Sequence, residues 1–207
     1  MPGATAHGVG DTDQGKLESG GAVTYLYQGA KHMVTGYDHL LFLVGVIFFL
    51  YHLRDVLIYV SFFTLGHSAT LLLGVLADIQ ANAFLIDAVI GLSVVYKGFE
   101  NLGGFERLGW RLDQRAAVLV FGLFHGFGLA TKLQDLDLPA DGLVGNMLAF
   151  NVGVELGQVL ALCLVFALLM TWRRHASYMR HAMWTNLGLM SAGFVLFGMQ
   201  MTGYVTH

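Results

Sequence analysis

Charged side chains are scarce in this chain of 207 residues. Asp, Glu, Lys and Arg together make up 12% of it, whereas an average soluble domain contains about 25%. Hydrophobic residues make up 56%. A chain of this length with so few charges predicts one all-α, polytopic membrane domain. The formal net charge of -3 provides no basic surface for nucleic acid, so we exclude a nucleic-acid partner.

Cysteine and proline are also rare. The single cysteine, Cys163, lies in an apolar run, which excludes an intrachain disulfide and a cysteine-rich metal site. The 27 glycines and 2 prolines are typical of membrane helices that pack closely through small residues. Residues 1–21 are polar and lack the apolar core of a signal peptide, so we interpret them as a flexible tail.

Long apolar runs predict a bundle of six transmembrane helices within residues 37–207. The expected helices cover residues 37–53, 56–77, 83–99, 116–131, 146–172 and 184–205. The segment before them, residues 22–36, is mildly amphipathic and predicts a helix that lies at the membrane interface.

The basic residues predict the orientation of these helices. Alternate connections contain seven arginines: Arg54, Arg107, Arg111, Arg115, Arg173, Arg174 and Arg180. The connections on the other side contain only Lys132. Because cytoplasmic loops carry an excess of Lys and Arg, we expect the arginine-rich side to be cytoplasmic and both termini to lie outside. In a bacterium this means the inner membrane, with periplasmic termini.

Ionisable and amide side chains interrupt the apolar runs, where each costs a few kcal/mol if it faces lipid. These side chains belong to Asp38, His39, His67, Asp87, His125, Asn151 and Glu155. Five of the six predicted helices bring such a group to the outer half of the membrane, which predicts one shared cavity open to the outside. His, Asp and Glu are the usual ligands of divalent metals, so the pattern indicates a metal site.

Several of these residues also have a purely structural interpretation. Asp38 can cap a helix start, or it can orient the neighbouring His39. His67 can form a hydrogen bond to another helix, and Asp87 can reach the outer interface. Any of these roles would need no metal.

Two further patterns favour a functional interpretation. Asn151, Glu155 and Gln158 are spaced i, i+4 and i+7, so they share one face of a helix. His125 lies beside Gly122 and Gly126, a small-xxx-small pair that lets two helix backbones approach closely. A histidine next to such a contact is buried in protein rather than in lipid.

Four segments resemble signatures of the HupE/UreJ family. The segment HMVTGYDHLLFL (32–43) resembles the family's opening signature, with Met33 where a proline is usual. The segment FFTLGHSATL (62–71) is similar to a signature of the wider nickel/cobalt permeases. The segments FGLFHGFGLA (121–130) and FNVGVELGQ (150–158) resemble later motifs of the second HupE/UreJ subgroup.

This resemblance extends from about residue 31 to the C-terminus and implies a six-helix membrane protein that handles Ni²⁺ or a similar ion. The site residues that it implies are His32, Asp38, His39, His67, His125 and Glu155.

We therefore predict a membrane permease or binding protein for a divalent transition metal. His67, His125 and Glu155 are the expected core ligands, and Asp38 and His39 are expected to guide the ion or support the ligands. His32 and Asn151 complete the predicted metal-site residues. Ni²⁺ is favoured, with Co²⁺ and Zn²⁺ as alternatives, because mixed nitrogen and oxygen ligation suits all three. The expected partners are lipid, the metal ion, and a second copy of the chain or an accessory subunit.

Two other functions are compatible with the same residues. A fixed metal with an open coordination position would activate water, giving an intramembrane hydrolase with Glu155 or Asp38 as general base. The inner half of the chain has few polar groups for ion release, which weakens the permease hypothesis and suits the hydrolase, although we favour the permease. A structural subunit, in which the polar groups only join helices, is the third possibility.

Overall fold

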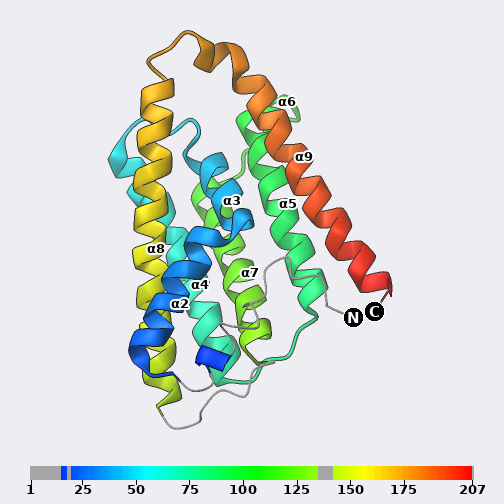
Figure 1. The fold of residues 1–207 in the computed structure, drawn as a ribbon. Coiled ribbons are helices and arrows are strands. Elements are labelled where there is room, and N and C mark those ends of the chain that lie inside the picture. The colour runs from blue at the N-terminus through cyan, green and yellow to red at the C-terminus, as the bar shows by residue number, and fades with distance from the viewer. Residues whose placement is uncertain (1–14, 18–19, 135–141, 207) are drawn as a thin grey trace.

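Every regular element in the described part of the chain is a helix, as the composition predicted. The structure is a computed structural model that describes residues 15–17, 20–134 and 142–206. The helices are α2 (Ala22–Thr35), α3 (Tyr37–Ile47), α4 (Leu53–Leu76), α5 (Ala83–Asn101), α6 (Gly104–Arg107), α7 (Gln114–Gln134), α8 (Leu143–Trp172) and α9 (Ser177–Thr206). Figure 1 shows them as an elongated bundle.

Four helices of the described residues, α4, α7, α8 and α9, are long and apolar enough to cross a membrane. The sequence predicted six. At about 1.5 Å per residue, the 11 residues of α3 extend over only about half of the ~30 Å of a hydrocarbon core. The 19 residues of α5 are long enough, but they include the charged residues Asp87, Lys97 and Glu100.

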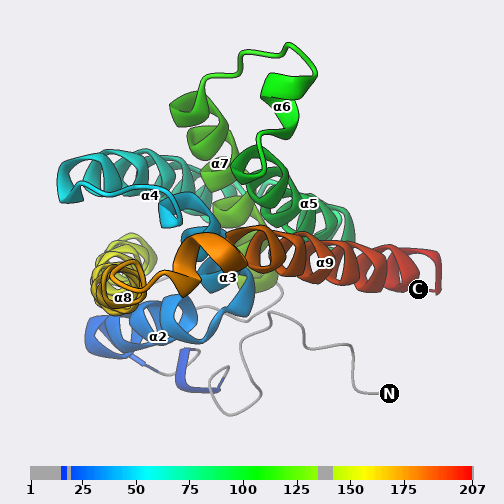
Figure 2. The ribbon, with the colours of Figure 1, turned by 90° about the horizontal axis from the view of Figure 1, so that it is seen from above.

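The helices associate in three pairs, α2 with α8, α4 with α7, and α5 with α9 (Figures 1 and 2). Glycines bring the two backbones of each pair together. A Cβ added at Gly29 of α2 would collide with the backbone of α8, one at Gly126 of α7 with the backbone of α4, and one at Gly91 of α5 with the backbone of α9. The abundance of glycine in the sequence therefore has a specific use, which is close pairing of helices.

The short helix α3 lies among these pairs (Figure 2). Arg173 holds its C-terminal end. The guanidinium of Arg173 donates hydrogen bonds to the backbone carbonyls of Ile47 at 2.7 Å, Phe48 at 2.5 Å and Leu50 at 2.7 Å. The Tyr178 hydroxyl also donates to the Phe48 carbonyl. The last carbonyls of a helix lack partners within the helix, and a cation there also suits the helix dipole. This is why α3 can end before the predicted boundary.

Helix α2 has the predicted length, but it lies alongside α8 rather than apart from the bundle (Figure 1). Its buried side includes Tyr25 and Met33. The predicted tail lies mostly outside the described residues. At its described end, Leu17 is fully buried and its carbonyl accepts a 2.9 Å hydrogen bond from the Tyr25 hydroxyl.

Gly36 separates α2 from α3, so two consecutive helices meet at a break inside the bundle.

The arginines lie in or next to three connections that gather at one end of the bundle, at the top of Figure 1. They are the connections between α3 and α4, between α5 and α7, and between α8 and α9. We call this the arginine end. The connection between α4 and α5 lies at the opposite end (Figure 1).

Candidate metal centre

Three histidines from three consecutive helices meet inside the bundle. His32 comes from the last turn of α2, His39 from the first turn of α3, and His67 from the middle of α4. One ring nitrogen from each lies within 4.8 Å of the corresponding nitrogens of the other two. We call these residues the three-histidine cluster. His39 is 3% exposed and His67 is 0% exposed, while His32 is partly buried, so protein encloses two of the three rings.

The cluster has the chemical character of a metal site. The Nε2 atom of His39 and both ring nitrogens of His67 are buried and have no hydrogen-bond partner among the described residues. Burying an unsatisfied polar atom costs about 1–3 kcal/mol, and a cation would satisfy such nitrogens. Four-coordinate ions with metal–nitrogen bonds of about 2.0–2.1 Å bring their ligand nitrogens to about 3.3 Å from one another. An ion would therefore draw ring nitrogens that now lie within 4.8 Å of one another closer by up to about 1.5 Å.

Asp38 fixes the orientation of His39. The Nδ1 atom of His39 lies 2.9 Å from a carboxylate oxygen of Asp38. A carboxylate accepts hydrogen bonds, so Nδ1 carries the proton and the lone pair of Nε2 remains for a ligand. Gly36 allows this arrangement, since a Cβ there would stand 2.9 Å from Nδ1 of His39 and 3.1 Å from the Asp38 oxygen.

His125 adjoins the cluster from α7. Its ring centroid is 4.9 Å from that of His39, but it is not among the three histidines whose nitrogens mutually lie within 4.8 Å. Its Nδ1 lies 2.8 Å from the carbonyl oxygen of Phe121, so Nδ1 donates and carries the ring proton. The ring of Phe63 lies 5.0 Å from that of His125 and 6.3 Å from that of His39. His125 is therefore next to the cluster rather than part of it.

Glu155, which the sequence predicted as a core ligand, lies on the exposed side of α8. It lines an open groove with Ser61, Thr64 and Ser68 of α4. The reason is helix geometry. Gly153 lies two residues from Glu155 and is pressed against α2, and residues two apart point about 200° away from each other on a helix. The face that binds α2 therefore turns Glu155 outward.

Asn151 and Asp87 are buried but belong to other contacts. The amide nitrogen of Asn151 donates to the carbonyl of Met147 at 3.2 Å, and its Oδ1 has no partner among the described residues. Asp87 accepts a 2.7 Å hydrogen bond from Lys132 of α7. This ion pair was not predicted, although Lys132 was the only basic residue in the connections on its side of the bundle.

The structure thus brings His67 together with His32 and His39, while the expected trio was His67, His125 and Glu155. The motif around His32 and His39 contained the stronger signal, because it supplies two imidazoles and a carboxylate within eight residues. Because the helix breaks at Gly36, the imidazoles of His32 and His39 come together although they belong to different helices.

Comparison with known proteins places the chain in a family. No curated protein and no solved structure matches it. The family model described as HupE / UreJ protein matches residues 12–207, which is nearly the whole chain. The four helices of membrane-spanning character and the histidine cluster agree with a membrane protein related to nickel and cobalt transport. On this match, the chain belongs to the HupE/UreJ family.

Proposed function

We propose that this protein is a membrane permease for a divalent transition metal, Ni²⁺ before Co²⁺ or Zn²⁺. The observation that carries the proposal is the three-histidine cluster, in which imidazole nitrogens from α2, α3 and α4 converge within 4.8 Å. The buried Nε2 of His39 and the buried ring nitrogens of His67 have no hydrogen-bond partner among the described residues, and such nitrogens are costly unless they bind something. Neutral imidazole is a common ligand of all three metals. The ligand type therefore indicates a divalent transition metal as the substrate but does not select one of the three ions.

In this proposal the ion exchanges water molecules for imidazole nitrogens. His32, His39 and His67 supply three ligands, and His125 supplies a fourth when its ring moves toward the cluster. Asp38 contributes in two ways. It keeps the proton of His39 on Nδ1, and its negative charge offsets part of the ion's charge in a region of low dielectric constant.

The break between α2 and α3 supports a sixth membrane crossing. Neither helix is a candidate span by itself, but they follow one another from the lower part of the bundle toward the arginine end (Figure 1). With α5 as a further crossing, the bundle crosses six times. Broken helices often hold ion sites in transporters, because the free backbone and side chains at the break line a cavity.

We infer the orientation from the arginine end, which would be cytoplasmic under the positive-inside rule. Both termini would then be periplasmic, in a bacterial inner membrane. The ion would reach the cluster from the end opposite the arginines.

Metal binding and transport by the purified protein test this proposal. We expect about one Ni²⁺ per chain, and Ni²⁺ uptake into proteoliposomes that falls at least tenfold in His39→Ala and His67→Ala. His175→Ala is the matched control, because His175 is exposed at the arginine end. Tight binding without uptake would instead favour a metal-dependent hydrolase. Absence of metal binding would favour a structural subunit.

A further inference from the structure

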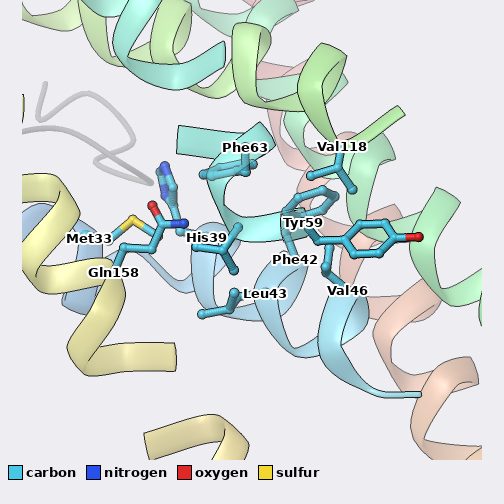
Figure 3. Close-up of a pocket in the computed structure, with 10 residues that line it drawn as sticks. Met33, His39, Phe42, Leu43, Val46, Tyr59, Phe63, Val118 and Gln158 are labelled. Carbon is cyan, nitrogen blue, oxygen red and sulfur yellow. The ribbon is translucent and has the colours of Figure 1, made fainter. Parts of the chain in front are cut away.

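A small cavity extends from His39 to Tyr59 and Val118 (Figure 3). His39, Met33 and Gln158 lie at one end of it, and Tyr59 and Val118 lie at the other. Tyr59 is near the start of α4 and Val118 near the start of α7, whereas the histidines of those helices lie further along them. The cavity therefore occupies the side of the cluster on which few polar groups were expected.

Gln158 gives this cavity a polar site next to the cluster. Its side chain is 1% exposed, and its Oε1 accepts a 2.9 Å hydrogen bond from the Thr64 hydroxyl. Its Nε2 is buried and has no hydrogen-bond partner among the described residues. An amide nitrogen donates hydrogen bonds, so it does not bind a cation directly. It suits the oxygen of a water molecule that accompanies a cation.

Tyr59 closes the other end of the cavity. Its hydroxyl donates a 2.8 Å hydrogen bond to Oε1 of Gln114, an exposed residue at the start of α7. Figure 3 shows this hydroxyl pointing away from His39. The hydrogen bond thus joins α4 to α7 between the cavity and the surface at the arginine end.

We infer that this cavity is the next position of the ion after the three-histidine cluster, and that the Tyr59–Gln114 hydrogen bond closes its exit. The inference rests on the proposed transport function. In this closed form the cavity has a volume of about 10 Å³, which is room for about one water molecule, so it must widen before an ion enters. The ion it would then admit is a divalent cation that keeps at least one water, whose oxygen accepts a hydrogen bond from Gln158. Apolar walls such as Phe42 and Val118 exclude an ion until water enters. The structure therefore represents a form closed toward the arginine end.

Cysteine accessibility tests the exit without requiring transport. In a Cys163→Ser background, Val118→Cys places a thiol in the cavity, and Val120→Cys places one on the outer face of the same helix. Val118 is 1% exposed and Val120 is 45% exposed in the bundle. A charged methanethiosulfonate reagent, added from the arginine end, labels only thiols that water reaches.

We expect Val118→Cys to react at least fivefold faster when Tyr59→Phe or Gln114→Ala removes the closing hydrogen bond. The reactivity of Val120→Cys should not change. Val60→Cys, a second cavity position, replaces Val118→Cys if that variant does not fold. Unchanged reactivity of both cavity thiols in both opening variants would overturn the inference.

A second experiment blocks the cavity. Val118→Phe fills the space, so Ni²⁺ uptake should fall at least tenfold while the stoichiometry of Ni²⁺ binding stays the same. Val120→Phe adds the same bulk outside the cavity and should transport normally. Wild-type uptake in Val118→Phe would place the path elsewhere and overturn the inference. If the wild type shows no uptake, the transport proposal fails, and the accessibility experiment still decides whether the cavity opens at Tyr59.

Discussion

The carboxylate of Asp38 accepts a hydrogen bond from Nδ1 of His39 at 2.9 Å, although the two residues are adjacent in the chain. Both side chains are nearly inaccessible to solvent. The bond holds the His39 ring with Nε2 directed away from the carboxylate. It therefore links a local sequence motif to the geometry of the three-histidine cluster.

Asp38→Asn should weaken metal binding without unfolding the protein. The amide keeps the shape of the side chain but loses its charge, and loss of a carboxylate behind a ligating histidine typically costs about 10–100-fold in metal affinity. Calorimetric titration with Ni²⁺ measures the change in Kd. The control is Asp78→Asn, because Asp78 is exposed and far along the chain from the cluster. An unchanged Kd in Asp38→Asn would remove Asp38 from the site.

Metal affinity should fall as the pH decreases through the range in which imidazole takes up protons. Protons and the metal compete for the same ring nitrogens, because only neutral imidazole binds a metal. Ni²⁺ binding should therefore weaken toward acid pH and become independent of pH once the imidazoles are neutral. Ni²⁺ titrations over the whole pH range in which the protein stays folded check this. Affinity that does not fall toward the acid end of that range would argue against imidazole ligands.

Glu155→Gln should leave Ni²⁺ affinity within about twofold of the wild type. The residue is exposed in the groove between α4 and α8, and α8 turns it away from the face that binds α2. His67→Gln is the comparison, since it alters the cluster itself by a change to a similar polar side chain. A tenfold or larger loss of affinity in Glu155→Gln would mean that Glu155 reaches the ion in another conformation.

Gly126→Ala should disrupt both the bundle and the cluster. The added Cβ would collide with the backbone carbonyl of His67, so α4 and α7 must move apart and displace that imidazole. Destabilisation of about 1–3 kcal/mol is typical of such overpacking. The matched control is Gly188→Ala in α9, where nothing lies within 4 Å of an added Cβ. Thermal unfolding in detergent and Ni²⁺ titration of both variants measure the two effects.

Arg173→Ala should destabilise the protein by about 2–4 kcal/mol, because it leaves several carbonyls at the end of α3 without their charged donor. Arg174→Ala is the control, since Arg174 is its exposed neighbour. Arg173→Lys should recover only part of the loss, because an ammonium cannot reproduce the forked geometry that bonds to Ile47, Phe48 and Leu50. Equal melting temperatures of Arg173→Ala and Arg174→Ala would contradict this role.

The sequence predicted the helical fold and the family from its apolar runs and motifs, because both are local signals. It also identified His39 and His67 as candidates, since histidines in apolar runs are unusual, and the family resemblance added His32. Which of the candidates meet depends on how each helix is rotated. For α8, the rotation can be recognised from Gly153 and Gly157, because these glycines mark the face that contacts α2. The position of Glu155 relative to that face then shows that its side chain points outward.

Long-range contacts were beyond prediction. The early end of α3 depends on Arg173, which lies more than a hundred residues further along the chain. Tyr59 and Gln114 likewise gain their role only when α4 and α7 lie side by side. Neither of these two contacts corresponds to a regular spacing of residues that could be recognised in the sequence. The short length of α3 and the placement of α2 within the bundle follow from such contacts.

The close pairing of helices at glycines distributes the proposed ligands between two helix pairs and α3. His32 belongs to the pair of α2 and α8, His67 and His125 belong to the pair of α4 and α7, and His39 stands on α3 between them. A slide of one pair past the other would change the spacing of the imidazoles while every helix stays intact. An ion bound to all three histidines of the cluster would hold both pairs and α3 together, and its release would require only a rigid displacement of one of them.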